Sequence, residues 1–394
     1  MSKMLSNKNN VIIASAGSGK TTYIVEEALK MKEQRVLVTT YTNENIDQIK
    51  TFFVEKAGCI PANITVQSWF SFLLQEGVRP YQNHMNDQKR VQSIFFQTKS
   101  SRYHREDNYL TSSNNIYSNK VAEFVYKCDK KTKGLISKRL EKIYDHIFID
   151  ELQDFAGYDL NLLEIFFNST ICIVAVGDPR QATFSTNNAQ KNKQYRKSNI
   201  YSWLKEKENN HEITIEEIND CHRCNQHICD FADKLFPDLP QTVSRNTSLT
   251  KHDGIFYILS NELDVYINTH NPVILRYSKN TDTLGLHALN IGVSKGRTYN
   301  RVLIFPTKPM LEYLKTEDIS KAGDKSKLYV AVTRAKYSVA FVVDDENLIK
   351  KNLPPEKLEI IHSKRVASAG GWGGMNPCLF LSNSYDCQYC LHFY

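Results

Sequence analysis

Short apolar runs rich in β-branched residues recur along the first half of the chain and predict buried strands. Segments with apolar residues at helical spacing lie between them; Ile46, Ile49 and Phe53, for example, share one face of a predicted helix. Because strands and helices alternate, we expect an α/β fold with a parallel sheet. The predicted strands lie within residues 11–13, 35–43, 64–74, 143–154 and 170–181.

The same alternation resumes at about residue 213 and predicts a second α/β domain. Its strands are expected at residues 255–259, 272–277, 301–305 and 338–343, with a helix over 327–335 before the last strand. We therefore expect a first domain over residues 1–212, a second over 213–355, and a tail over 356–394 that is rich in Gly, Cys and aromatic residues.

A polar, basic stretch over about residues 79–140 interrupts the first domain, and we predict an inserted helical subdomain there. Its second part places lysines and arginines among aromatic residues such as Phe124 and Tyr126. Two interpretations stay open: a solvated helical face, or a surface that contacts a phosphate backbone. The net charge of +7 suits a polyanionic partner, although this value is modest for 394 residues.

The composition is that of an ordinary globular protein, with 24% charged and 41% apolar residues. The first ten residues lack the apolar core of a signal peptide, and the longest apolar runs are too short to cross a bilayer. Nine cysteines, mostly within apolar or helical segments, favour reduced thiols and a cytoplasmic location without membrane contact. The Cys-x-x-Cys pairs at Cys221 and Cys387 lie far apart, so we favour free thiols over a zinc site.

The strongest local signal is the loop that follows the first predicted strand. The sequence passes from residues 11–13 through small residues to Lys20 and Thr21 at the start of an amphipathic helix. Small residues let backbone N–H groups surround phosphate oxygens, and the helix N-terminus adds a favourable dipole. Lys20 would contact the β- and γ-phosphates, and the Thr21 hydroxyl would bind Mg²⁺. A turn without a ligand is a poor explanation for a Lys-Thr pair after Gly-Ser-Gly.

Adjacent carboxylates at the end of a later strand are the second signal. Asp150 suits the Mg²⁺ shell, and Glu151 suits the task of orienting or deprotonating water. A non-functional acidic turn would explain one acid, but not Asp-Glu-x-Gln-Asp. Gln181, after the next strand, could contact a γ-phosphate or its attacking water. Phe184 could stack on a base or fill a core.

Taken in order, these segments resemble the UvrD/Rep/PcrA-type superfamily 1 DNA helicases over about residues 11–343. The phosphate loop over 14–22 and the acidic box over 150–154 are two of the matching motifs. The others are Thr40-Tyr-Thr-Asn43, Gln67-Ser-Trp-Phe-Ser-Phe72, Gly177-Asp-Pro-Arg-Gln-Ala-Thr-Phe184, His222-Arg223, Ser294-Lys-Gly-Arg-Thr-Tyr299 and Leu328-Tyr-Val-Ala-Val-Thr-Arg-Ala335.

The resemblance implies two RecA-like P-loop domains with parallel sheets and an ATP cleft between them. Hydrolysis of ATP with Mg²⁺ would drive movement along single-stranded or tailed DNA, 3′ to 5′. Arg223 and Arg334 would act as arginine fingers beside the catalytic Glu151 and Gln181. The implied nucleotide contacts are Ala14, Ser15, Ala16, Gly17, Ser18, Gly19, Lys20, Thr21, Thr22, His222 and Gly296, with Thr21 and Asp150 as metal ligands.

The implied DNA contacts lie at strand ends in the first domain and at one lysine in the second. Aromatic side chains suit a translocase, because every base has a face on which they can stack. The expected residues are Tyr41, Thr42, Asn43, Ser68, Trp69, Phe184 and Lys295.

The chain also departs from the family pattern. Thr22 and His222 stand where the family often has an Arg and a Tyr around adenine, and the large insertion expected between Arg223 and Lys295 is essentially absent. We therefore favour ATP-dependent translocation over processive strand separation. The alternative hypothesis is a nucleotide- or DNA-sensing ATPase subunit that regulates a nuclease partner in a DNA repair or anti-phage assembly.

Overall fold

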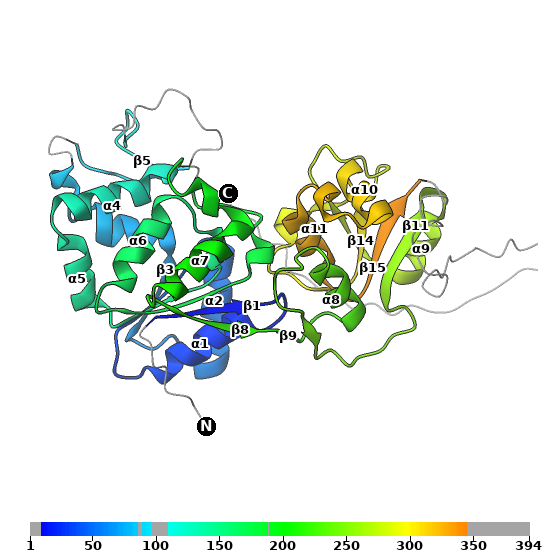
Figure 1. The fold of residues 1–394 in the computed structure, drawn as a ribbon, viewed down its shortest axis with the longest axis horizontal. Helices are drawn as coiled ribbons and strands as arrows, with labels where there is room; N and C mark the ends of the chain where they lie inside the picture. Colours follow the sequence, from blue (N-terminus) through cyan, green and yellow to red (C-terminus); the bar gives the residue numbers. More distant parts are fainter. Residues whose placement is uncertain (1–8, 86–88, 97–108, 188, 345–394) are drawn as a thin grey trace, which may run out of the picture. The chain divides into compact units, whose positions relative to one another are not determined.

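Two parallel β-sheets, each covered by helices, form the described part of the chain and confirm the α/β fold expected from the sequence (Figure 1). None of the helices in this part is long and apolar enough to cross a membrane. The tail over 356–394, including Cys387, lies outside the described residues. The computed structural model describes residues 9–85, 89–96, 109–187 and 189–344.

The first sheet has six parallel strands in the order β3-β2-β6-β7-β1-β8. Because β8 pairs along the whole of β1, the sheet extends beyond residue 212, where the sequence analysis ended the first domain. The exposed Glu216 and Glu217 interrupt the apolar pattern of this edge strand. The strands are β1 (Asn10–Ala14), β2 (Val36–Thr40), β3 (Ile64–Ser68), β6 (His146–Ile149), β7 (Cys172–Gly177) and β8 (Thr214–Ile218).

Alternate residues of the first sheet face two different helical layers. On β1, Ile12 belongs to a core formed with α1 and α2, whereas Val11 and Ile13 belong to a core formed with α3 to α7. Both faces are therefore buried, as is usual for parallel sheets. The helices are α1 (Lys20–Lys30), α2 (Asn43–Ala57), α3 (Trp69–Phe72), α4 (Val121–Lys131), α5 (Leu135–Ile143), α6 (Tyr158–Phe167) and α7 (Ile200–Asn209).

The inserted segment is partly helical, as expected, and also contains a short parallel strand pair, β4 (Ile94–Phe95) and β5 (Ile116–Tyr117). One face of α4 is apolar, and its Phe124 is buried in the core. The lysines Lys130 and Lys131 at its end are exposed. This helix therefore serves the core with one face and leaves a basic surface on the other.

The second sheet has five parallel strands in the order β11-β15-β14-β12-β13. Helices α8, α10 and α11 pack against one face of this sheet, and α9 packs against the opposite face. Because β15 begins at Ala335, α11 ends earlier than predicted and Arg334 lies in the turn between them. The elements are β11 (Gly254–Leu259), β12 (Val273–Arg276), β13 (Leu289–Asn290), β14 (Tyr299–Phe305), β15 (Ala335–Val343), α8 (Gln226–Asp233), α9 (Leu263–His270), α10 (Lys308–Thr316), α11 (Lys325–Val332), and a separate pair, β9 (Asp220–Cys221) with β10 (Val243–Ser244).

Candidate active site

The loop between β1 and α1 has the backbone shape of a phosphate-binding loop. Gly17 has φ of +78° and Gly19 has φ of +84°, in the left-handed region that favours glycine. A Cβ atom at Gly17 would lie only 2.7 Å from Cβ of Arg223. The glycine therefore also permits the close approach of the segment that carries a predicted arginine finger.

Polar groups of this loop suit phosphate oxygens. The Lys20 Nζ donates to the carbonyl oxygens of Ala14 (3.1 Å) and Ser15 (2.9 Å). Burial lowers the pKa of Lys20, an effect that the carboxylate of Asp178 opposes. The Ser18 Oγ is buried and has no hydrogen-bond partner among the described residues. A phosphate bound here would offer acceptors to both side chains, so the residues present fit a nucleotide.

The two predicted metal ligands lie next to each other. The Thr21 Oγ1 donates to the Asp150 Oδ2 at 2.9 Å. Burial, and then the charge of Glu151, raises the pKa of Asp150 to about 6. A hydroxyl and a carboxylate are the oxygen ligands that Mg²⁺ prefers, and Mg²⁺ usually needs only one or two protein ligands beside substrate phosphates. The described residues contain no group of three or more His, Cys, Asp or Glu that could hold a metal ion by themselves.

Glu151, the predicted general base, is held by a lysine from the second half of the chain. Its carboxylate accepts a hydrogen bond from Gln153 Nε2 and lies 3.4 Å from Lys295 Nζ. The same ammonium lies 2.8 Å from Asp154. Burial alone would raise the pKa of Glu151, but the charges of Lys295 and Lys20 outweigh burial and lower it. This carboxylate is therefore ionised at neutral pH.

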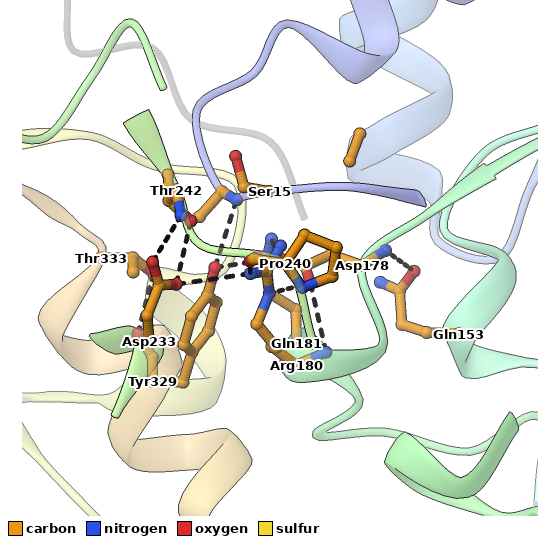
Figure 2. A network of polar contacts seen from close by, with 12 residues as sticks. Ser15, Gln153, Asp178, Arg180, Gln181, Asp233, Pro240, Thr242, Tyr329 and Thr333 are labelled. Atoms are coloured by element: carbon orange, nitrogen blue, oxygen red, sulfur yellow. Dashed lines mark hydrogen bonds and ion pairs between the residues drawn. The ribbon is translucent and has the colours of Figure 1, made fainter. Parts of the chain in front are cut away.

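Asp178, which follows β7, is the centre of a buried hydrogen-bond network (Figure 2). Its carboxylate accepts from Arg180 Nε at 2.8 Å and from Gln181 Nε2 at 2.9 Å. The Tyr329 hydroxyl on α11 donates to it at 3.2 Å and accepts from the Ala16 N–H at 3.3 Å. The phosphate loop, the end of β7 and α11 are thereby joined through one carboxylate and one hydroxyl.

Arg180 is a buried member of this network to which the sequence motifs assigned no role. Its side chain is 1% exposed, and Nη1 lies 3.4 Å from Asp233 Oδ1 and 3.2 Å from the Pro240 carbonyl oxygen (Figure 2). Burial would lower the pKa of Arg180, but the charge of Asp178 outweighs it and raises the pKa. Its place two residues after Asp178 was visible in the sequence, whereas its partners about 50 to 60 residues away were not.

One of the two predicted arginine fingers, Arg334, contacts the predicted catalytic glutamine, and the other, Arg223, contacts the residue before Arg334. The Arg334 Nη2 donates to Gln181 Oε1 at 3.2 Å, and the Arg223 Nη1 donates to the Thr333 carbonyl oxygen at 3.1 Å. Burial, together with the nearby Arg223, lowers the pKa of Arg334 to about 9, so the guanidinium remains charged at neutral pH. Both arginines line the same cavity as Lys20 and Gln181.

A cavity of about 340 Å³ lies over the phosphate loop. Its lining combines predicted residues of both halves, namely Gly17, Gly19, Lys20, Thr21, Thr22, Glu151, Gln181, His222, Arg223, Gly296 and Arg334. Residues that the motifs did not assign to the nucleotide also line it: Asn45, Gln48, Phe52, Thr298 and Lys336. The volume and the polar lining suit a nucleoside triphosphate.

Two family models match the sequence. A model of an AAA domain matches residues 1–187, and a model of the viral superfamily 1 RNA helicase core domain matches residues 110–343, more than half of the 394 residues. The chain belongs to the viral superfamily 1 RNA helicase core family. This match confirms the superfamily 1 helicase core inferred from the motifs and agrees with an ATP-hydrolysing enzyme. The narrower UvrD/Rep/PcrA-type resemblance stays a prediction.

Solved helicase structures are similar to this helicase core at low identity. A PRRSV helicase structure is 14% identical with a TM-score of 0.41, and the match covers 86% of this chain and 52% of that chain. An arterivirus nonstructural protein 10 (helicase) in complex with DNA is 15% identical with a TM-score of 0.44, covering 86% and 62%. The core thus spans less than two thirds of the length of these proteins. No curated protein matches the sequence.

The prediction that Trp69 contacts nucleic acid is wrong. Trp69 is fully buried, its Nε1 donates to Asp159 Oδ1 at 2.7 Å, and its ring packs against Phe72 and Phe155. It therefore belongs to the core of the first half and cannot stack on a base. An aromatic residue at a strand end can face either solvent or the core, and the sequence pattern did not separate the two.

The other expected contacts lie near the carboxyl ends of the strands of the first sheet, except for Lys295. Thr42 and Ser68 cap α2 and α3 by accepting hydrogen bonds from Asn45 N–H and Ser71 N–H. The remaining residues differ in exposure: Asn43 and Phe184 are exposed, Tyr41 is half-buried, and Lys295 is held by carboxylates. Their contact with nucleic acid stays a prediction.

Proposed function

We propose that this helicase core is an ATP-driven motor that moves along single-stranded nucleic acid. The observation that carries the proposal is the bond between Arg334 and Gln181, 3.2 Å long, above a phosphate loop. It joins a residue of the second half to the expected γ-phosphate sensor of the first half. A site built from two halves can change their contacts at each hydrolysis step, and a motor requires such a change.

Each side chain of the site has a role that its position supports. Lys20 and the loop N–H groups would bind the phosphates. Mg²⁺, held by Thr21 and Asp150, would neutralise phosphate charge. Glu151, kept ionised by Lys295, would accept a proton from the attacking water. Arg334, still charged despite its lowered pKa, would stabilise negative charge in the transition state together with Arg223.

Lys295 connects the catalytic acid with nucleic-acid binding. Its side chain is 15% exposed, and its ammonium is shared between Glu151 and Asp154. A phosphate of a bound strand would compete for this ammonium and would free Glu151 to act on water. Nucleic acid should therefore stimulate hydrolysis.

The first experiment is an ATPase assay with and without oligo-dT and oligo-U, on the wild type and on Glu151→Gln. We expect stimulation by the oligonucleotide in the wild type and a fall in kcat of roughly 10²- to 10⁴-fold in Glu151→Gln, with nucleotide binding retained. The exposed Glu217→Gln on β8 is the matched control. A rate that ignores both the oligonucleotide and the substitution would contradict the proposal.

A second experiment compares duplexes with a 3′ or a 5′ single-stranded tail. Unwinding of the 3′-tailed duplex is expected from the UvrD/Rep/PcrA-type resemblance, and unwinding of only the 5′-tailed one would reverse the proposed polarity. Stimulated hydrolysis that yields unwinding only when a nuclease partner is added would favour the regulatory-subunit hypothesis.

A further inference from the structure

The inserted segment carries the excess positive charge of the chain. Between residues 79 and 140, the described residues include ten Lys or Arg and two Asp or Glu, a net charge of +8. The whole chain has a net charge of +7, so the remainder is close to neutral. A polyanionic strand would therefore be attracted chiefly to this segment.

A line of aromatic rings connects the insertion with the strand ends of the first sheet. The ring centroids of Phe184 and Tyr41 are 5.1 Å apart, those of Tyr41 and Phe70 are 5.2 Å apart, and those of Phe70 and Phe96 are 5.4 Å apart. The inner Phe70 is buried at 6% exposure, whereas the terminal rings of Phe184 and Phe96 are 53% and 64% exposed. The buried ring of Phe70 thus packs directly against the exposed ring of Phe96 and is connected through Tyr41 to that of Phe184.

The exposed end of this line on the insertion lies next to positive charge in the sequence. Phe96 directly follows β4, and the exposed Arg90 lies a few residues before that strand, with its Nη1 2.6 Å from Asn83 Oδ1. A single exposed aromatic residue is common on protein surfaces. An exposed ring on a basic segment, connected through packed rings to a second exposed ring, is instead the arrangement that single-strand binding needs, because rings stack on bases and cations contact phosphates.

We propose that Phe96 is a base-stacking residue and that the insertion continues the binding surface for single-stranded nucleic acid beyond Phe184. This inference rests on the proposed function and assigns part of its substrate contact to a segment outside the helicase motifs. Stacking on a phenylalanine face does not depend on base identity, so the insertion would add affinity without sequence preference.

The test measures binding of a fluorescent oligo-dT to the full chain and its Phe96→Ala variant by anisotropy. We expect the dissociation constant to rise roughly 5- to 150-fold in Phe96→Ala, the range for loss of one stacked base. Hydrolysis of ATP without oligonucleotide should be unchanged. Phe96→Trp should bind at least as tightly as the wild type. Leu249→Ala, which removes an 89% exposed apolar side chain from the second half, should bind like the wild type.

Salt dependence separates stacking from charge. The slope of log affinity against log salt should be unchanged in Phe96→Ala and should fall by about 1 in Arg90→Gln if that guanidinium contacts a phosphate. Equal binding by the wild type and Phe96→Ala, or weaker binding by Phe96→Trp, would overturn the inference and leave the motor proposal standing. Absence of both binding and stimulation in the wild type would instead overturn the motor proposal.

Discussion

Tyr329→Phe tests the connection between the phosphate loop and the second half of the chain. The substitution removes one oxygen and leaves the buried ring in place. That oxygen accepts from the Ala16 N–H at 3.3 Å and donates to Asp178 at 3.2 Å. Asp178 keeps hydrogen bonds from Arg180 and Gln181, whereas the Ala16 N–H has no other partner among the described residues.

The expected loss follows from these two bonds. A bond to a charged group contributes about 1.5–3 kcal/mol and a neutral bond about 0.5–1.5 kcal/mol, and both distances here are long, so we expect about 2–3 kcal/mol. An unfolding entropy of about 2.1 cal/mol/K per residue gives roughly 0.8 kcal/mol/K for this chain. The melting temperature should therefore fall by about 2–4 °C when the chain unfolds in a single transition.

The expected fall in melting temperature is measured by circular dichroism on Tyr329→Phe and on a matched variant, Tyr313→Phe. Tyr313→Phe makes the same change at another buried tyrosine of the second half, whose hydroxyl has no hydrogen bond with the described residues, and should change the melting temperature by less than about 1 °C. If Tyr329→Phe melts like the wild type, the hydroxyl does not connect the loop with α11 in solution.

Two further predictions concern single positions in the first half. Gly17→Ala should weaken binding of a fluorescent ATP analogue at least about tenfold, because the new Cβ would lie 2.7 Å from Arg223 and the backbone φ is +78°. Gly19→Ala is the milder control, because Gly19 has a similar φ but open space around it. Equal losses of affinity in the two variants would exclude contact with Arg223 as the cause. Burial raises the pKa of Asp159 to about 6, against about 4 in unfolded chains, so the folded state binds this proton more tightly than the unfolded state. The free energy of unfolding should therefore fall by roughly 3 kcal/mol as the pH rises from 4 through 6. The stability advantage of the wild type over Asp159→Asn in thermal melts should therefore shrink between pH 4 and 7, and a constant difference would contradict the assignment.

The parts of the site that could be predicted from the sequence lie at the carboxyl ends of parallel strands. Lys20, Asp150 and Gln181 each follow an apolar run, and parallel strands bring such ends to one edge of the sheet. Their relative positions then depend on strand order, which the alternating pattern suggests only loosely. The order and spacing of the motifs indicated which of these strand ends belong to one site.

The parts that could not be predicted depend on long-range packing. Trp69 and Phe184 follow strand ends of the same sheet. The ring of Trp69 is buried, with its N–H bonded to Asp159, whereas the ring of Phe184 is exposed. The edge strand β8 escaped detection because the consecutive residues Glu216 and Glu217 are both exposed and break its apolar pattern. No local pattern indicates which distant residue accepts a buried Trp N–H or covers a strand.

Three of the residues expected to touch substrate share one property that sequence cannot show: the protein already supplies each with a partner. Lys20 donates to carbonyl oxygens of its own loop, Glu151 is paired with Lys295, and Gln181 accepts from Arg334. Nucleotide and nucleic acid bound as proposed would exchange these contacts for new ones. Because Lys295 and Arg334 belong to the second half and Glu151 and Gln181 to the first, the exchanges at these two pairs would alter contacts between the halves. Under the proposed function, these exchanges would convert hydrolysis in the site into relative movement of the two sheets.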